Sequence, residues 1–209
     1  EWQAPLQGPG GPTIIQVTGV SFLVAEFVRP EFEVSIDADG ENYADGDTIF
    51  ATTEARFFSG GVLPGAEVAW AALSYPYSIR VEEFQRYSFS DWDYWRVFRG
   101  DGDPLRARGT GTTDDLGRFT FQVPAEILAE EGPRRYTISA TVIDENGQAV
   151  ATSTNVTVHP ADRYAGIRPT EYVAQAGEQA SVDLVTITKE GDIAPGVPVT
   201  VEVYSRRWV

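Results

Sequence analysis

Two runs of residues around one turn decide the fold class: Arg135-Tyr-Thr-Ile-Ser-Ala-Thr-Val-Ile143 and the run from Ala149 to Val158 flank Asp144-Glu-Asn-Gly147. Both runs alternate apolar and polar residues, the period of two expected of a half-buried β-strand. Asn-Gly between two such runs is a strong short-range signal for a β-hairpin. This stretch therefore predicts two antiparallel strands that pack on a core through one face.

Strand signals of the same kind recur along the chain, separated by Gly, Pro, Asn and Asp. Several short strands at this spacing predict an all-β fold of tandem immunoglobulin-like sandwiches. The one helical signal is Pro124 to Glu131, with proline in a first turn and Gly132-Pro133 after the end, which predicts a short helix near 124–131. The other predicted strands span residues 22–28, 31–36, 48–58, 66–73 and 119–123.

An internal repeat sets the predicted domain organisation. Gly46-Asp47 and Gly177-Glu178 each precede a β run, a Pro-Gly pair and another β run. The Pro-Gly pairs, Pro64-Gly65 and Pro195-Gly196, lie 131 residues apart, as do the two leading glycines. Such self-similarity is typical of repeated structural units.

The repeat predicts three segments. Residues 1–29 would hold the last strands of a preceding unit, 30–160 a complete sandwich, and 161–209 the start of the next unit, cut after its third strand. A half-sandwich cannot bury both faces of its sheet, so we expect 161–209 to be weakly stable alone. Pairing with residues 1–29, within the chain or in a neighbouring molecule, is the hypothesis that would complete it.

Composition narrows the function classes. The chain has 31 acidic and 16 basic residues, a net charge of −15, which disfavours nucleic-acid partners and anionic membrane surfaces. There are no cysteines, and thus no disulfides, thiolate metal sites or cysteine nucleophile. We find no apolar run long enough to span a membrane. Because the chain also lacks methionine, we expect a piece of a longer or processed protein.

Several strings, taken in order, resemble the macroglobulin-like domains of bacterial alpha-2-macroglobulins. The resemblance covers roughly residues 20–209, and its first string matches the junction between consecutive domains of that family. The strings are Val24-Ala-Glu-Phe-Val-Arg-Pro-Glu-Phe-Glu-Val34, Tyr43-Ala-Asp-Gly-Asp47 with Ala51-Thr-Thr-Glu-Ala55, Phe58-Ser-Gly-Gly-Val-Leu-Pro-Gly-Ala-Glu-Val-Ala-Trp70, and Thr113-Asp-Asp-Leu-Gly-Arg-Phe-Thr-Phe121.

The resemblance implies a framework segment from the N-terminal domain array of a protease trap, which contributes to endopeptidase inhibition by the full-length protein. It further implies a periplasmic or cell-surface location, with a lipid anchor on the full-length protein as one option. The implied partners are neighbouring domains of the same chain and target proteases. The family's Cys–Gln thioester is absent here, and Gly177-Glu-Gln179 is only a superficial echo of it.

Signals for chemistry are weak. His159 is the only histidine and precedes Pro160, so we interpret it as a linker residue, and we expect no catalytic residue, zinc site or cofactor. Acidic clusters at 37–41, 45–47, 101–103 and 114–115 fit turn chemistry better than calcium binding. We therefore do not expect an enzyme.

One stretch, residues 75–108, stands out as a long insertion rich in aromatic residues and arginine. Such side chains pack on a sandwich, form a protein interface, or stack on sugars. Packing on the sandwich is the favoured interpretation. Carbohydrate binding would make the protein an extracellular adhesin or carbohydrate-binding module, which is the alternative function. The candidate partner contacts within the stretch are Trp92, Tyr94, Trp95 and Arg96.

Overall fold

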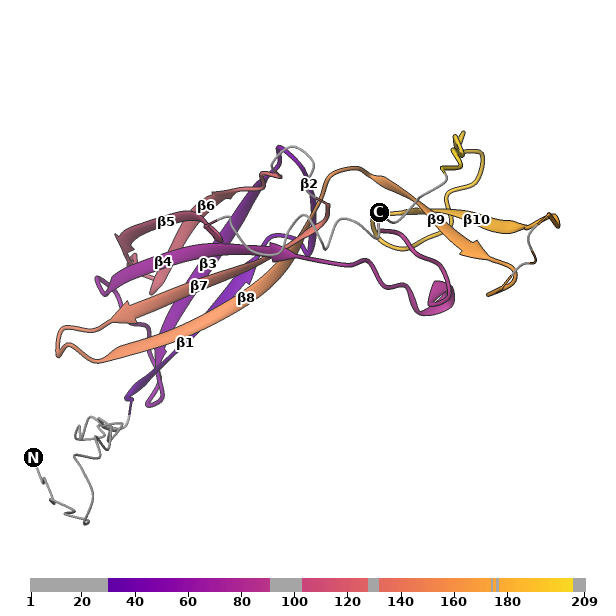
Figure 1. Cartoon of the computed structure of the whole chain (residues 1–209). Coiled ribbons are helices and arrows are strands. Elements are labelled where there is room, and N and C mark those ends of the chain that lie inside the picture. Colours follow the sequence, from indigo (N-terminus) through magenta and orange to yellow (C-terminus); the bar gives the residue numbers. More distant parts are fainter. Residues whose placement is uncertain (1–29, 91–102, 128–131, 174, 176, 205–209) are drawn as a thin grey trace, which may run out of the picture.

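The computed structural model describes residues 30–90, 103–127, 132–173, 175 and 177–204. These residues form a two-sheet β-sandwich and, beyond its end, a separate two-stranded hairpin (Figure 1). In the described part of the chain the one helical element is the single 3-10 turn η1 (Glu82–Phe84).

Two sheets make the sandwich. The first has the order β1-β3-β6 and is antiparallel throughout; its strands are β1 (Phe32–Ala38), β3 (Thr48–Phe57) and β6 (Arg118–Pro124). The second has the order β2-β8-β7-β4-β5 and is antiparallel except where β2 runs parallel to β8. Its strands are β2 (Asn42–Ala44), β8 (Ala149–His159), β7 (Arg134–Ile143), β4 (Glu67–Pro76) and β5 (Leu105–Thr112).

The core lies between these sheets and follows from the alternation seen in the sequence. Every second residue of β7 is buried, from Tyr136 to Val142, and faces the inward side chains of β1, β3 and β6. Trp70 of β4 crosses the core to stack on Phe121 of β6, with ring centroids 4.4 Å apart. Ring stacking of this kind adds to the stabilisation that comes from burying apolar area.

The predicted fold class is confirmed, as are the strands around residues 31–36, 48–58, 66–73, 119–123 and 135–158. The Asn-Gly hairpin is also present: Ile143 pairs with Ala149 across the turn. The strand predicted over 22–28 lies outside the described residues.

The short helix predicted near 124–131 is not found in its described part. Pro124 is the last residue of β6, and the chain continues without helical turns to Ile127. The backbone groups there bond to a neighbouring loop: the Ala125 N–H donates to the Asp47 carbonyl (2.9 Å) and the Ile127 N–H to Asp45 Oδ1 (2.8 Å). These long-range partners satisfy the backbone in place of a helix; residues 128–131 lie outside the described residues.

The aromatic insertion is narrower than residues 75–108, because β4 extends to Pro76 and β5 begins at Leu105. Strand β5 was missed since it contains glycine where a strand pattern calls for side chains. A Cβ at Gly109 would lie 2.8 Å from the Trp70 ring, and one at Gly111 would lie 2.2 Å from the Phe119 ring. Gly109 thus makes room for a ring of the adjacent strand β4, and Gly111 for a ring of β6 in the opposite sheet.

The separate hairpin consists of β9 (Arg163–Pro169) and β10 (Val182–Thr188), and it repeats the β1–β3 pairing. Arg163 pairs with Thr188 as Phe32 pairs with Phe57, each partner shifted by 131 residues. The bridge Arg56↔Val62 recurs as Ile187↔Ile193 at the same offset.

The turns repeat as well as the strand register. Gly46 and Gly177 have φ angles of 90° and 91°, and Gly65 and Gly196 have 71° and 74°. Positive φ is open to glycine and strained for most other residues. The repeat in the sequence therefore corresponds to matching local structure.

Candidate junction between the sandwich and the β9–β10 hairpin

The candidate site is the place where the sandwich meets the hairpin, which we call the junction. Strand β8 ends at His159, and β9 begins four residues later at Arg163. Contacts at the junction come from the end of β8, from β2, and from the described part of the connection between β4 and β5, residues 77–90, which we call the excursion (Figure 1).

His159 lies at the centre of the junction and is only 2% exposed. Its Nδ1 is 2.8 Å from the Tyr164 hydroxyl, and its Nε2 is 3.0 Å from Asn42 Oδ1. Because an amide oxygen only accepts, Nε2 carries the proton and Nδ1 accepts from the tyrosine hydroxyl. A neutral imidazole thus joins β8, β2 and β9. The sequence-based interpretation of His159 as a linker residue is corrected: it is the buried end of a strand.

The electrostatics of this cluster favour the neutral histidine. Burial lowers the pKa of His159 because it penalises the charged imidazolium, and Lys189 lowers it further, while Glu190 and Asp162 act in the opposite direction. Burial also penalises the charged form of Tyr164, the phenolate, and so raises its pKa; Asp162 makes a smaller contribution in the same direction. The hydroxyl of Tyr164 therefore keeps its proton.

Beside this cluster, Lys189 and Asp162 connect the end of β10 to the start of β9. The Lys189 N–H donates to the Asp162 carbonyl (2.9 Å), and Lys189 Nζ lies 3.3 Å from Asp162 Oδ1. The Asp162 side chain is 76% exposed, so the ion pair itself contributes little to stability. The backbone bond fixes where β10 ends relative to the start of β9.

The excursion forms backbone hydrogen bonds with the hairpin at the edge of β9 that does not pair with β10. The Ser88 N–H donates to the Ile167 carbonyl (2.9 Å) and the Ile167 N–H to the Ser88 carbonyl (3.0 Å), which makes an isolated antiparallel bridge. The next residue, Phe89, lies over Gly166, where an added Cβ would be 2.5 Å from the ring. Gly166 therefore provides the space that the phenylalanine occupies.

Two further contacts extend this grip. The Arg168 guanidinium lies 4.8 Å from the centroid of the Tyr87 ring, within cation–π range, and is ion-paired with Asp183 of β10. In the turn that follows β10, Gly191 lies close to Val81. A Cβ added at Gly191 would be 3.3 Å from the valine side chain. The excursion thus contacts β9 through its backbone and side chains, and the turn after β10 through Val81.

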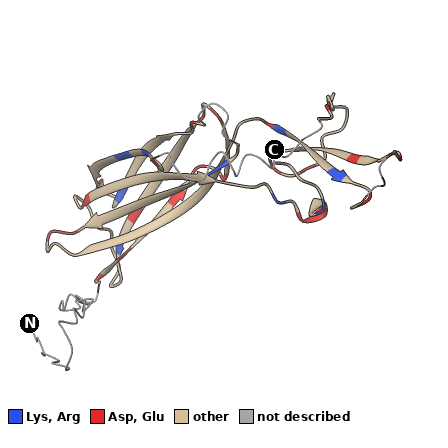
Figure 2. Ribbon diagram, in the orientation of Figure 1, with Lys and Arg blue, Asp and Glu red and all other residues tan. Residues whose placement is uncertain are grey.

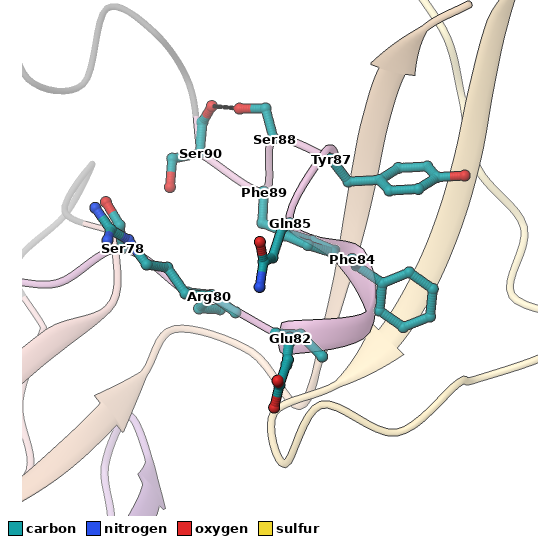
Figure 3. Close-up of a pocket in the computed structure, with 11 residues that line it drawn as sticks. Ser78, Arg80, Glu82, Phe84, Gln85, Tyr87, Ser88, Phe89 and Ser90 are labelled. Carbon is teal, nitrogen blue, oxygen red and sulfur yellow. Dashed lines mark hydrogen bonds between the residues drawn. The ribbon is translucent and has the colours of Figure 1, made fainter.

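A cavity of about 770 Å³ opens beside the excursion, and its lining among the described residues lies between Ser78 and Ser90. Figure 3 shows the Tyr87 ring pointing away from the cavity, toward the β9–β10 ribbon. Phe84 meets Tyr87 edge-on, with centroids 5.8 Å apart. The Tyr87 ring is therefore directed at the hairpin and not into the cavity (Figure 3).

The face of β9 that is covered in the hairpin corresponds to the face of β1 that is exposed to solvent in the sandwich. In β1 the alternate residues Glu33 and Ser35 are exposed, whereas their equivalents in β9, Tyr164 and Gly166, are buried. The opposite face, which is core in the sandwich, is open in the hairpin: Ile167 and Leu184 are each 42% exposed.

The proposed partner contacts Trp92, Tyr94, Trp95 and Arg96 lie outside the described residues. The described aromatics of the stretch divide between two neighbours. Tyr77 turns to the sandwich, where the Arg135 guanidinium lies 4.7 Å from its ring centroid. Tyr87 and Phe89 turn to the hairpin. Sequence reasoning identified the stretch but not these residues, since neither their glycine nor their arginine partner is near them in the sequence.

The acidic clusters act in turns. Asp39 Oδ1 accepts from the Tyr43 hydroxyl (2.6 Å) and from the Phe50 N–H (2.9 Å), and the tyrosine bond is the main cause of the lowered pKa of Asp39. Asp114 Oδ1 accepts from two N–H groups of its own turn. Among the described residues, no three His, Asp or Glu side chains converge as a metal site would require.

Figure 2 shows charged residues of both signs interspersed along the described strands and turns. Over the same described ranges, no helix combines the length and apolar character needed to cross a membrane.

No family model matches the chain. Over 159 residues it is 26% identical to an alpha-2-macroglobulin of Thermotoga maritima, which covers 73% of this chain and 9% of the relative. It is 21% identical over 195 residues to an alpha-2-macroglobulin homolog of Nostoc sp., covering 92% of this chain and 10% of that one. The chain thus spans about a tenth of the length of these relatives.

Among solved structures, the chain is similar to trypsin-activated alpha-2-macroglobulin from Escherichia coli, with a TM-score of 0.58, 16% identity, and coverage of 79% of this chain and 12% of that one. Fold and comparisons together define the class of fold: the described residues form a β-sandwich similar to those of macroglobulin-like domains. The chain's resemblance to the bacterial alpha-2-macroglobulin family is confirmed.

Proposed function

We propose that the chain is a structural framework segment of a bacterial alpha-2-macroglobulin and contributes to endopeptidase inhibition by the full-length protein. In this function it catalyses no reaction. Its partners are the neighbouring macroglobulin-like domains and, through the full-length protein, target proteases in the periplasm or at the cell surface. The observation that carries the proposal is the junction, where the sandwich contacts the β9–β10 hairpin.

The domain boundaries follow from the same repeat. We place one complete unit at residues 30–160, the start of the next at 161–209 and the end of a preceding one at 1–29. The matching register of β1–β3 and β9–β10 supports the second boundary.

The contacts of the junction fit a role in holding two units at a fixed angle. They include a buried three-way hydrogen-bond cluster, a backbone bridge and an aromatic ring seated over glycine. Packed contacts of this kind allow a few discrete arrangements rather than continuous bending. A rearrangement elsewhere in a trap would therefore reach the next unit through the junction. The relative whose structure is trypsin-activated supports a link to proteases.

The adhesin or carbohydrate-binding alternative is not favoured by the described contacts. It would use the aromatic stretch as an exposed binding face, but Tyr87 and Phe89 are engaged with the hairpin.

The test removes the bridge in a full-length protein that carries this segment. Ser88→Pro deletes the N–H that bonds to Ile167, whereas Ser88→Ala keeps that N–H and is the matched control. We expect the proline variant to fold but to capture less protease, measured as the protease activity that remains toward a large protein substrate. Equal capture by Ser88→Pro, Ser88→Ala and wild type would contradict the proposed role of the junction.

A further inference from the structure

We propose that His159 is a pH-sensitive latch: its neutral imidazole holds the β9–β10 hairpin against the sandwich, and its protonation releases the hairpin. The inference concerns regulation of the junction, so its biological consequence rests on the proposed function. The latch itself is a property of the chain and can be measured on it.

The first argument is the direction of the hydrogen bonds. With Nε2–H donating to Asn42 Oδ1, Nδ1 is an acceptor and receives the Tyr164 O–H at 2.8 Å. Protonation turns Nδ1 into a donor, so the Tyr164 oxygen must accept from it and the hydroxyl hydrogen loses its acceptor. In the described part of the chain that hydroxyl has His159 as its hydrogen-bond partner. The closed junction then holds a buried O–H donor without an acceptor, which disfavours it relative to the open form.

The second argument is burial. His159 is 2% and Tyr164 9% exposed, so an imidazolium here would be largely cut off from water. Opening the junction exposes the ring and removes that penalty. A proton therefore binds the open arrangement more readily than the closed one, which is the thermodynamic requirement for a switch.

The charged groups around the ring do not cancel this preference. Burial is the largest influence on the pKa of His159 and lowers it; Lys189 of the hairpin also lowers it, and Glu190 and Asp162 raise it less. From the sandwich, β2 contributes the uncharged Asn42, and the Asp45 N–H bonds to the His159 carbonyl rather than to the ring.

The sign of the pH dependence follows. In the closed junction the pKa of His159 lies below its ordinary value of 6.5. At pH values between these two pKa values the open form therefore binds more protons than the closed form. The latch is at full strength above that ordinary value and weakens as the pH falls through the lower pKa of the closed form. Mild acid should thus loosen the junction while near-neutral pH keeps it closed.

The experiment measures the titration and the geometry on the same chain. His159 is the only histidine, so its imidazole NMR resonances need no assignment, and the lack of cysteine allows spin labels at Ser153→Cys in β8 and Leu184→Cys in β10. Both label sites are exposed. We expect one narrow label-to-label distance at neutral pH, and loss of that distance with the same midpoint as the His159 titration.

Two variants decide the outcome. His159→Gln keeps a donor and an acceptor but cannot titrate, so its distance should not change over this pH range. Tyr164→Phe removes the hydrogen bond that stabilises the neutral ring, so its midpoint should move to higher pH. If the glutamine variant fails to fold, the tyrosine variant alone decides. A distance that stays fixed while His159 titrates, or that changes equally in His159→Gln, overturns the latch. Neither result depends on protease capture, so failure of the latch is distinguishable from failure of the proposed function.

Discussion

Thr113 shows how one buried hydroxyl can join two turns of the sandwich. Its Oγ1 donates to the Leu63 carbonyl (2.7 Å) and accepts from the Ala66 N–H (2.9 Å), and the residue is 5% exposed. Both backbone partners would be buried without a bond if the hydroxyl were absent. Burying an unpaired backbone group costs more than the net gain from an ordinary hydrogen bond.

Replacing this hydroxyl by a methyl group should therefore destabilise the sandwich. We expect Thr113→Val to lower the free energy of unfolding by about 1–3 kcal/mol. Thr110→Val, an exposed position in β5, is the matched control and should change it by less than about 0.5 kcal/mol. Urea unfolding of both variants measures the difference, and equal stability of the two would show that Thr113 has no such role.

Tyr136 plays a comparable part at the connection between β6 and β7. Its side chain is fully buried, and its hydroxyl donates to the Glu126 carbonyl (2.6 Å) and accepts from the Glu126 N–H (3.2 Å). A tyrosine at the start of a strand that bonds back to the preceding connection is a known feature of immunoglobulin-like sandwiches. These two bonds hold the segment for which the sequence predicted a helix.

We expect Tyr136→Phe to cost about 1–2 kcal/mol of unfolding free energy, because the ring stays buried while the Glu126 backbone loses its partner. Thermal unfolding followed by circular dichroism provides the measurement. Tyr75→Phe, at a residue that is 45% exposed, is the control. A Tyr136→Phe melting temperature equal to that of the control would count against the bond.

At the scale of elements, alternation made most strands predictable, but two features depended on residues distant in the sequence. Strand β5 was missed because its Gly109 and Gly111 are explained only by the rings of Trp70 on the adjacent strand and Phe119 on the opposite sheet. The grip of the excursion on β9 was equally hidden, because Phe89 and Gly166 are far apart in the chain. The sequence identified the aromatic stretch as unusual, yet its partner could be found only from the fold.

The excursion's grip can be tested at Gly166. A valine there would clash with the Phe89 ring, so we expect Gly166→Val to detach the excursion from β9 without unfolding the sandwich. Ala165→Val, on the exposed face of the same strand, is the matched control. Limited proteolysis should cleave the glycine variant within residues 77–90 at least about tenfold faster than the control. Similar cleavage of both variants would mean that the contact between Phe89 and β9 does not require a glycine at position 166.

At the scale of the whole molecule, the sandwich and the hairpin differ in how much structure supports each strand. Strand β7 has hydrogen-bonded neighbours on both sides, β4 and β8, and lies over a filled core. Strand β10 pairs with β9 in a two-stranded sheet with one open face. The repeat in the sequence predicts that residues 161–209 begin a further unit, but it did not show which face of the β9–β10 pair would be covered.

This difference predicts a gradient of local stability. We expect the amides of β10 to exchange with deuterium at least about 100-fold faster than those of β7, because the hairpin can open without unfolding the sandwich. Native-state hydrogen exchange on the full chain, resolved by NMR or mass spectrometry, measures both strands together. Equal protection would indicate that the two parts unfold as one body.

The covered face of β9 has a consequence for which of the two equivalent strand pairs the excursion can contact. Where β9 has Gly166, β1 has Ser35, and where β9 has Tyr164, β1 has Glu33. A ring like that of Phe89 would collide with the serine side chain and would strip water from the carboxylate. The β1–β3 pair could therefore not take the place of β9–β10 against the excursion, so two small differences at equivalent positions decide which of the two strand pairs Phe89 covers.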